Sequence, residues 1–153
     1  MRIFRGDMFT QCKSGDALCV TTNGIITNAG KLVMGAGVAL EFRNRFAGID
    51  AKLAGYVSKY GNRVFRIGKA NISGKEVMLF SFPTKHHWKE QSDLKLIEQS
   101  CIQLKEVVEK FKIQGDVYLP APGCGNGGLN WEMDVKSTVL KHLADDKYII
   151  CFR

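Results

Sequence analysis

The spacing of apolar residues predicts helices and strands that alternate along the chain. The clearest helix follows Ser92, which we expect to cap it, and its apolar residues recur three and four positions apart from Leu94 to Phe111. Shorter helical patterns cover residues 37–46, 49–60 and 131–143. Short and mainly apolar runs predict strands at residues 1–9, 17–22, 64–70, 76–82, 116–119 and 148–152.

This order of elements predicts an α/β fold, with three α/β/α layers around a mixed, largely parallel central sheet. Ser73 and Gly74 lie between two strands and predict a hairpin, which makes one strand pair antiparallel. Residues 76–82 are almost all apolar, as expected of a strand in the interior of the sheet. No linker, repeat or low-complexity segment divides the chain, so we expect residues 1–153 to form a single domain.

A glycine-rich stretch lies between the strand at 116–119 and the helix after Trp131. It has four glycines within the six residues from Gly123 to Gly128, so its backbone can approach a ligand without side chains in the way. A helix N-terminus presents free N–H groups and a positive dipole end, which attract anions. Residues 34–42 repeat this arrangement at the start of another helix. We therefore expect the two stretches to form two arms of one phosphate-binding cleft.

The glycine loops allow other interpretations. Gly123, Gly125 and Gly128 match the GxGxxG pattern of dinucleotide-binding folds, which also require an acidic residue at the end of the next strand. That strand ends in Phe152 and Arg153, which argues against a dinucleotide site. Neither loop carries the Gly-Lys-Ser/Thr sequence of a P-loop. A tight connection without a ligand remains the alternative.

Composition is typical of a globular protein, with 45% hydrophobic and 24% charged residues. No apolar stretch approaches the roughly 20 residues of a membrane span, and the charged N-terminus lacks the apolar core of a signal peptide. We therefore expect a cytoplasmic protein without membrane contact. The formal net charge of +7 favours anionic partners, among them nucleotides and nucleic acids.

The cysteines and histidines do not predict a metal centre. The five cysteines are scattered and form no CxxC pair, so we expect reduced and buried thiols. The adjacent His86 and His87 would point in opposite directions from an extended segment, and no third ligand is evident. We therefore expect neither a metal nor a cofactor.

Taken together, these motifs resemble the macrodomain family, which binds ADP-ribose. The resemblance extends over nearly the whole chain and depends on the combination of four stretches, Gly6–Phe9, Val20–Asn23, Met34–Ala39 and Gly123–Trp131. It implies the three-layer α/β/α macrodomain fold.

Within the family, the chain resembles the subgroup that holds the human terminal ADP-ribose protein glycohydrolase and the DarG-type antitoxins, which remove ADP-ribose from DNA. The stretch Phe82–Trp88 resembles the lysine-bearing loop of these antitoxins. Phage-encoded members of the subgroup are known, and this chain could be one of them.

The resemblance also implies roles for particular residues. Lys85 would act on the anomeric carbon of the distal ribose as an amine nucleophile, and Asn23 would reach that ribose. Asp7 would accept a hydrogen bond from the adenine amino group, with a backbone N–H supplied by Met8. Backbone donors of the two glycine loops would hold the pyrophosphate, namely those of Gly35, Ala36, Gly37, Val38, Ala39, Gly123, Cys124, Gly125, Asn126, Gly127 and Gly128.

Two features depart from the pattern of the subgroup. The protein-directed glycohydrolase has an aspartate in the second glycine loop that resolves its lysyl intermediate, whereas the matching residue here is Gly127, as in the DNA-directed antitoxins. The stretch 25–33 is also longer than expected and could cover the distal ribose.

Three functions remain open on this basis. The resemblance favours an ADP-ribosyl hydrolase of the glycohydrolase class that releases ADP-ribose from modified DNA or protein, and the net charge and Gly127 favour nucleic acid. A phosphatase that acts on ADP-ribose 1″-phosphate is the second function, and a non-catalytic reader of ADP-ribose is the third. The expected partner is ADP-ribose or an ADP-ribosylated DNA or protein. We expect a monomer by default.

Overall fold

The computed structural model describes residues 1–153 and contains one six-stranded sheet. The strands are β1 (Arg2–Arg5), β2 (Ala17–Thr22), β3 (Arg66–Ile72), β4 (Lys75–Pro83), β5 (Val117–Pro120) and β6 (Tyr148–Phe152). Their order in the sheet is β1-β6-β5-β2-β4-β3. All neighbouring strands are parallel except β3 and β4, which form the predicted hairpin.

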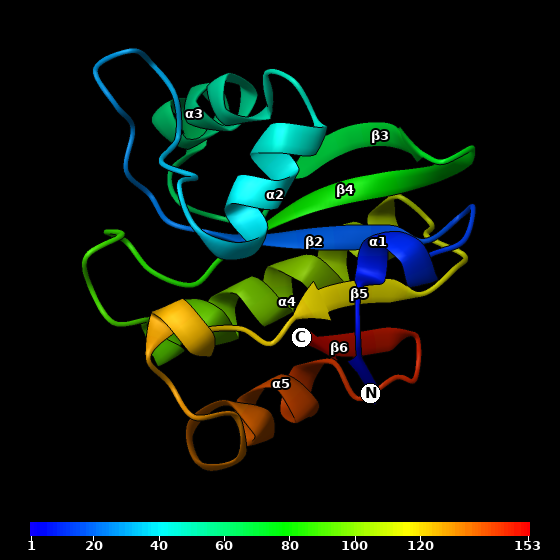
Figure 1. Ribbon diagram of the computed structural model, residues 1–153. Coiled ribbons are helices and arrows are strands. Elements are labelled where there is room, and N and C mark those ends of the chain that lie inside the picture. The colour runs from blue at the N-terminus through cyan, green and yellow to red at the C-terminus, as the bar shows by residue number, and fades with distance from the viewer.

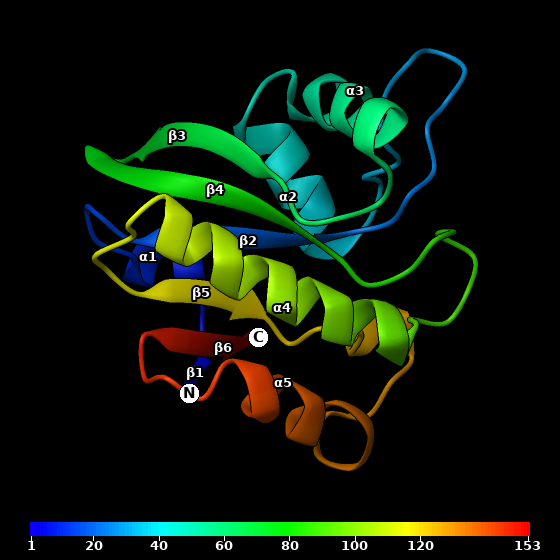
Figure 2. The ribbon, with the colours of Figure 1, turned by 180° about the vertical axis from the view of Figure 1, so that it is seen from behind.

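Helices cover both faces of the sheet. They are α1 (Met8–Gln11), α2 (Gly37–Arg45), α3 (Ile49–Tyr60), α4 (Leu94–Lys110) and α5 (Lys136–His142). The first three lie on one face, and α4 and α5 lie on the other (Figures 1 and 2). The predicted three-layer α/β/α fold is therefore confirmed. None of the helices is both long and apolar enough to cross a membrane.

Two apolar cores, one on each face of the sheet, hold the layers together. Each core contains 18 buried residues. Phe42 of α2 and Leu53 of α3 are fully buried in the first core, and Ile97 and Leu104 of α4 are fully buried in the second. The strand β2 contributes to both cores, because successive side chains of a strand point to opposite faces.

The first predicted strand is too long. It ends at Arg5 rather than at residue 9, and Met8 and Phe9 belong to α1. The Asp7 carboxylate accepts a hydrogen bond from the Phe9 N–H at 2.9 Å and so caps this helix. Apolar residues in a short helix and at a strand end give the same local pattern, and only the cap distinguishes them.

Two helix starts also differ from the prediction. Asp93 and not Ser92 caps α4, because the Asp93 carboxylate accepts a hydrogen bond from the N–H of Lys95 at 2.9 Å. The last helix starts with a π-helical turn, Trp131–Val135, before it continues as α5. A 3₁₀ turn, Gly125–Gly127, precedes it within the second glycine loop.

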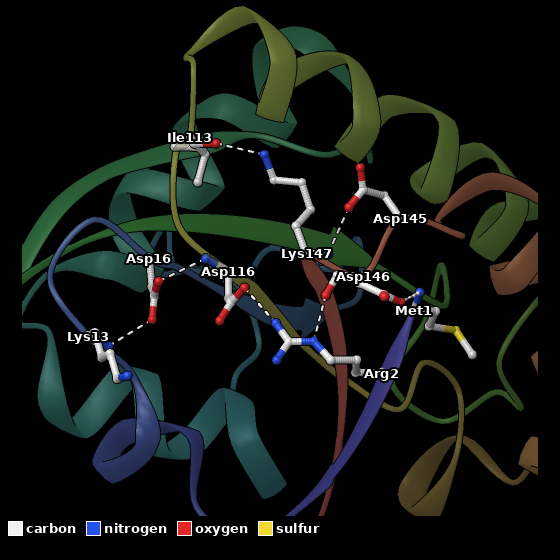
Figure 3. A network of polar contacts seen from close by, with 9 residues as sticks. All are labelled: Met1, Arg2, Lys13, Asp16, Ile113, Asp116, Asp145, Asp146 and Lys147. Carbon is white, nitrogen blue, oxygen red and sulfur yellow. Dashed lines mark hydrogen bonds and ion pairs between the residues drawn. The ribbon is translucent and has the colours of Figure 1, made fainter.

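A polar network joins the amino ends of the parallel strands (Figure 3). The buried carboxylate of Asp16, directly before β2, accepts hydrogen bonds from the N–H groups of Lys13 (2.7 Å) and Asp116 (2.8 Å). Asp116 directly precedes β5, and its own carboxylate pairs with the Arg2 guanidinium of β1 at 2.7 Å. These contacts fix β1, β2 and β5 relative to one another at this end of the sheet.

The path of the chain reverses between the neighbouring strands β2 and β5. After β2 the chain runs through α2 and α3 toward β3 and β4, whereas after β5 it runs through α5 to β6 on the opposite side of the sheet. The loops that leave these two strands therefore diverge onto opposite faces. Such a reversal in an open α/β sheet leaves a crevice at the carboxyl ends of the strands, where ligands bind.

Replacing Asp16 with alanine is expected to lower the free energy of unfolding by about 1–3 kcal/mol, because buried backbone N–H groups lose their acceptor. Urea denaturation followed by circular dichroism measures this change. Glu76→Ala is the control, because Glu76 forms only an exposed pair with Lys69 at 3.5 Å and should contribute less than about 1 kcal/mol. Wild-type stability of the Asp16→Ala protein would show that the network does not hold the strands.

Candidate functional site

A cleft of about 820 Å³ occupies the crevice beside β2 and β5. Its volume lies within the range of about 300–1,000 Å³ that is usual for ligand sites. It is lined by residues that follow β2, β4 and β5 and by the end of β6, so it opens at the carboxyl end of the sheet. Figure 1 shows the loops after β2, β4 and β5 projecting together from this end, at the left of the view.

The first glycine loop forms one wall of the cleft. Gly35, Ala36, Gly37, Val38 and Ala39 all line it. The helix α2 begins at Gly37, whose φ of +56° lies in the left-handed region that favours glycine. No side chain caps this helix, and the residues of its first turn line the cleft, so its positive dipole end lies at the cleft.

The second glycine loop forms the opposite wall, and its glycines serve different purposes. A Cβ at Gly123 would lie 2.8 Å from the side chain of Ile97, so Gly123 lets the loop pack on α4. A Cβ at Gly125 would meet nothing within 4 Å, so Gly125 leaves space in the cleft that it lines. The two walls approach each other closely, because a Cβ on Gly37 would lie 3.2 Å from Nδ2 of Asn126.

The remaining residues of the second loop divide into two groups. Cys124, Asn126 and Gly127 line the cleft. Gly128 does not line the cleft, and its N–H donates to the carbonyl of Gly125 at 3.1 Å and closes the 3₁₀ turn. The structure thus places Gly128 as a support of the loop.

Asp7 lies beside the cleft rather than in its lining. Oδ1 of Asp7 caps α1 and lies 3.4 Å from the Arg153 guanidinium. Arg153 also pairs with Glu41 at 2.6 Å, and this hydrogen bond raises the pKa of Arg153. Glu41 and Arg153 line the cleft together with Met8. The sequence analysis missed this ion cluster, because its members lie in separate elements and form no local motif.

Lys85 lies in the cleft lining and joins two loops. Its Nζ donates hydrogen bonds to the carbonyls of Trp88 (3.3 Å), Glu90 (3.4 Å) and Asn126 (3.4 Å). The first two carbonyls belong to its own loop, whereas the third belongs to the second glycine loop. The carbonyl of Lys85 in turn accepts a hydrogen bond from Nδ2 of Asn62 at 3.1 Å. The predicted reactive amine is therefore positioned against one wall of the cleft.

Asn23 is buried, and it lines the cleft. Its Nδ2 donates to the carbonyl of Val33 at 3.0 Å, and its Oδ1 accepts from the N–H of Ile25 at 2.9 Å. The side chain thereby fixes both ends of the stretch 25–33, of which Val33 lines the cleft. A primary amide has a second N–H and further lone pairs, so Asn23 retains the capacity to bind a ligand.

Ser92 is a cleft residue that the sequence analysis assigned to helix capping. Its hydroxyl is buried without a hydrogen-bond partner, while its N–H donates to the carbonyl of Gly127 at 2.9 Å. A Cβ at Gly127 would overlap this hydroxyl. An aspartate at this position, as in the protein-directed glycohydrolase, therefore cannot fit unless Ser92 moves. A buried serine beside a helix start and a capping serine have the same sequence pattern, which explains the misassignment.

All five cysteines are free thiols, and no cluster of three side chains that could hold a metal ion is present. Burial raises the pKa of Cys101 and of Cys151 to about 12. Cys124 differs from the others because it is only half-buried, and burial raises its pKa as well. Its position in the cleft makes it a useful reporter of the site.

The fold and the cleft at the β2–β5 reversal define the class of protein: the chain has the macrodomain fold. It superposes on the macrodomain of Mycobacterium tuberculosis DarG with a TM-score of 0.77 and 29% identity, over 99% of this chain and 97% of that one. It also superposes on DarTG of Thermosipho africanus, solved in complex with ADP-ribose, with a TM-score of 0.78 and 25% identity, over 99% of this chain and 42% of that one.

Sequence comparison leads to the same group. The DNA ADP-ribosyl glycohydrolase of Mycobacterium tuberculosis is 33% identical over 124 residues, which are 78% of this chain and 34% of that protein. The chain thus spans about a third of the length of the curated relatives that it matches over most of its own length. No family model matches the chain. Within the macrodomain class, the chain resembles the DarG macrodomains, as its motifs indicated.

In the native protein, a maleimide should label Cys124 before the other four cysteines, because those four are buried. The labelling rate at Cys124 should increase with pH, because only the thiolate reacts and burial raises its pKa. Mass spectrometry after timed labelling measures the order of reaction, and labelling in urea is the control in which all five react. Early labelling of Cys19 or Cys101 in the native protein would contradict their burial in the core.

Proposed function

We propose that this chain binds ADP-ribose in the cleft and, as an ADP-ribosyl hydrolase, releases it from modified DNA. The position of Lys85 is the main support for this proposal. Its amine lies in the same cleft as the two glycine loops and donates a hydrogen bond to the second of them. Anion-binding walls beside an amine suit a substrate in which a diphosphate adjoins a reactive sugar carbon. The relatives, a DNA ADP-ribosyl glycohydrolase and a DarTG protein solved in complex with ADP-ribose, support the same substrate.

The pyrophosphate lies between the two glycine loops in this proposal. The free N–H groups at the start of α2 and the backbone of the second loop act as its donors. Asp7 and Met8 serve the adenine, and Oδ2 of Asp7 is available for the amino group because Oδ1 is already engaged by Phe9 and Arg153. The second N–H of Asn23 serves the distal ribose.

Lys85 acts on the anomeric carbon of the distal ribose. The neutral amine forms a bond to this carbon, the bond to the DNA base breaks, and the base leaves with the electron pair and takes up a proton. Water then displaces the lysine, so that the net reaction consumes one water and yields ADP-ribose and unmodified DNA. Because attack requires the lone pair of the amine, Lys85 has to release a proton and at least one of its three carbonyl contacts first.

DNA is favoured over protein as the carrier of ADP-ribose. The net charge of +7 attracts a polyanion. Gly127 also leaves the second glycine loop without the aspartate on which the protein-directed enzyme depends. The proposal treats residues 1–153 as a single domain and, as the sequence predicted, places the reaction in the cytoplasm.

Gly125→Val is expected to abolish binding of ADP-ribose, because the valine side chain would fill the open space between the two walls. Stabilisation of the protein by ADP-ribose in thermal denaturation measures binding. Gly15→Val is the matched control, because Gly15 also has a positive φ (+91°) with open space around it but does not line the cleft. Undiminished stabilisation of folded Gly125→Val by ADP-ribose would show that the ligand lies elsewhere.

Lys85→Ala is expected to lower the rate of ADP-ribose release from modified DNA by about 10²–10⁴-fold while ADP-ribose still binds. Lys85→Arg should be equally slow, because arginine keeps the charge and the N–H donors but cannot be deprotonated. Chromatographic detection of released ADP-ribose measures the rate. Lys31→Ala is the control, since Lys31 is exposed on a neighbouring loop outside the cleft. An active Lys85→Arg protein would exclude nucleophilic attack by this residue.

The same assays separate the other two functions left open by the sequence. A reader binds ADP-ribose without releasing it from DNA or protein, and its affinity survives Lys85→Ala. A phosphatase releases inorganic phosphate from ADP-ribose 1″-phosphate and leaves modified DNA intact. Either result for the wild-type chain would replace the proposed hydrolase.

A further inference from the structure

The ion pair between Glu41 and Arg153 lies in the cleft lining but takes no part in the proposed reaction. Glu41 belongs to α2, the helix that begins in the first glycine loop, whereas Arg153 directly follows β6. Their side chains are 29% and 51% exposed, so burial in a core does not hold either of them in place. Exposed ion pairs contribute at most about 1 kcal/mol to stability. The position of this pair therefore points to a role toward the ligand.

Arg153 joins this pair to Asp7. Its Nη1 lies 2.6 Å from the Glu41 carboxylate, and its Nη2 lies 3.4 Å from Oδ1 of Asp7. One planar guanidinium thus bridges two carboxylates from different elements, which suits the fork of N–H donors in arginine better than the single ammonium of lysine. Because the contact with Glu41 is the shorter of the two, Glu41 determines where the guanidinium lies, and the guanidinium in turn fixes Asp7.

The contacts of Asp7 make its two carboxylate oxygens unequal. Each oxygen of a carboxylate has about two lone pairs. Oδ1 accepts the N–H of Phe9 at 2.9 Å and also lies against the Arg153 guanidinium, so both of its lone pairs are engaged. Oδ2 makes neither of these contacts and keeps its lone pairs. Asp7 can therefore accept N–H groups of a ligand through one oxygen only.

A single acceptor oxygen suits adenine and not guanine. On its pairing edge adenine presents one amino group beside a ring nitrogen that is itself an acceptor, so one carboxylate oxygen satisfies it. Guanine presents two adjacent N–H donors on the same edge, and these match both oxygens of a carboxylate at once. With Oδ1 of Asp7 engaged, one of the two guanine donors stays without an acceptor, which lowers affinity.

We propose that Arg153, held by Glu41, restricts Asp7 to one acceptor oxygen, so that the cleft selects ADP-ribose over the same ligand with a guanine base. The inference rests on the proposed function, because it takes Asp7 as the residue that serves the adenine. Arg153 is a positioning residue in this role, since it acts on the base through Asp7. Without the guanidinium, Oδ1 regains a lone pair and Asp7 can accept both N–H groups of guanine.

Calorimetric titration with ADP-ribose and with GDP-ribose tests the proposal, because the two ligands differ only in the base. The wild-type chain should bind ADP-ribose more tightly, and Arg153→Ala should reduce this preference about ten-fold. Arg153→Lys should reduce it as well, because an ammonium keeps the charge but not the planar bridge. Glu41→Gln should shift the preference in the same direction. The change of net charge in these variants affects both ligands alike and cancels in the ratio of affinities.

Arg43→Ala is the matched control, because Arg43 is exposed on α2 outside the cleft lining, and the preference should stay within about two-fold of wild type. An unchanged preference in folded Arg153→Ala would overturn the inference. An equal loss of affinity for both ligands would overturn it too, because Arg153 would then act on a part that the ligands share. Failure of the wild-type chain to bind ADP-ribose would refute the proposed function and this inference together, whereas binding without preference for adenine would refute the inference alone.

Discussion

The reversal of the chain between β2 and β5 is the constraint on which the site depends. These strands are neighbours, yet their connections lead to helices on opposite faces of the sheet, so a crevice has to remain between the loops. Two glycine stretches almost 90 residues apart in the chain thereby meet, with Gly37 near Asn126. Glycine favours this close packing, because a Cβ at Gly123 or Gly127 would come within 3 Å of the side chain of Ile97 or Ser92. The parallel sheet therefore determines where an anion can bind, and the glycines determine how closely the backbone approaches it.

The two ends of the sheet are built differently. At the amino end, side chains such as Asp16 tie neighbouring strands together. At the carboxyl end, backbone and side-chain groups both attach the loop after β4. The N–H of Thr84 donates to the carbonyl of Thr22 at 3.0 Å, and that of Ser92 donates to the carbonyl of Gly127 at 2.9 Å. Nζ of Lys85 donates to the carbonyl of Asn126 at 3.4 Å. These contacts attach the loop to the end of β2 and to the second glycine loop.

The layers, the hairpin and the two glycine loops at helix starts follow from sequence patterns, because apolar periodicity and glycine spacing are local properties. Contacts between distant side chains have no such signature. The ion cluster of Arg153 with Glu41 and Asp7 was therefore missed, and Ser92 was taken for a cap although its hydroxyl lies buried beside Gly127. The helical state of residues 8 and 9 depends on the Asp7 cap, which competes with an equally apolar strand pattern.

The central claim is that the two glycine loops together form a site for ADP-ribose. Calorimetric titration of the wild-type chain with ADP-ribose, with AMP as the comparison, tests it most directly. Because AMP lacks the second phosphate and the distal ribose, it can occupy only the adenosine end of the cleft. The account predicts that ADP-ribose binds much more tightly than AMP. Equal affinities for ADP-ribose and AMP, or no binding of ADP-ribose, would show that the two glycine loops do not bind a diphosphate. Either result would contradict the account.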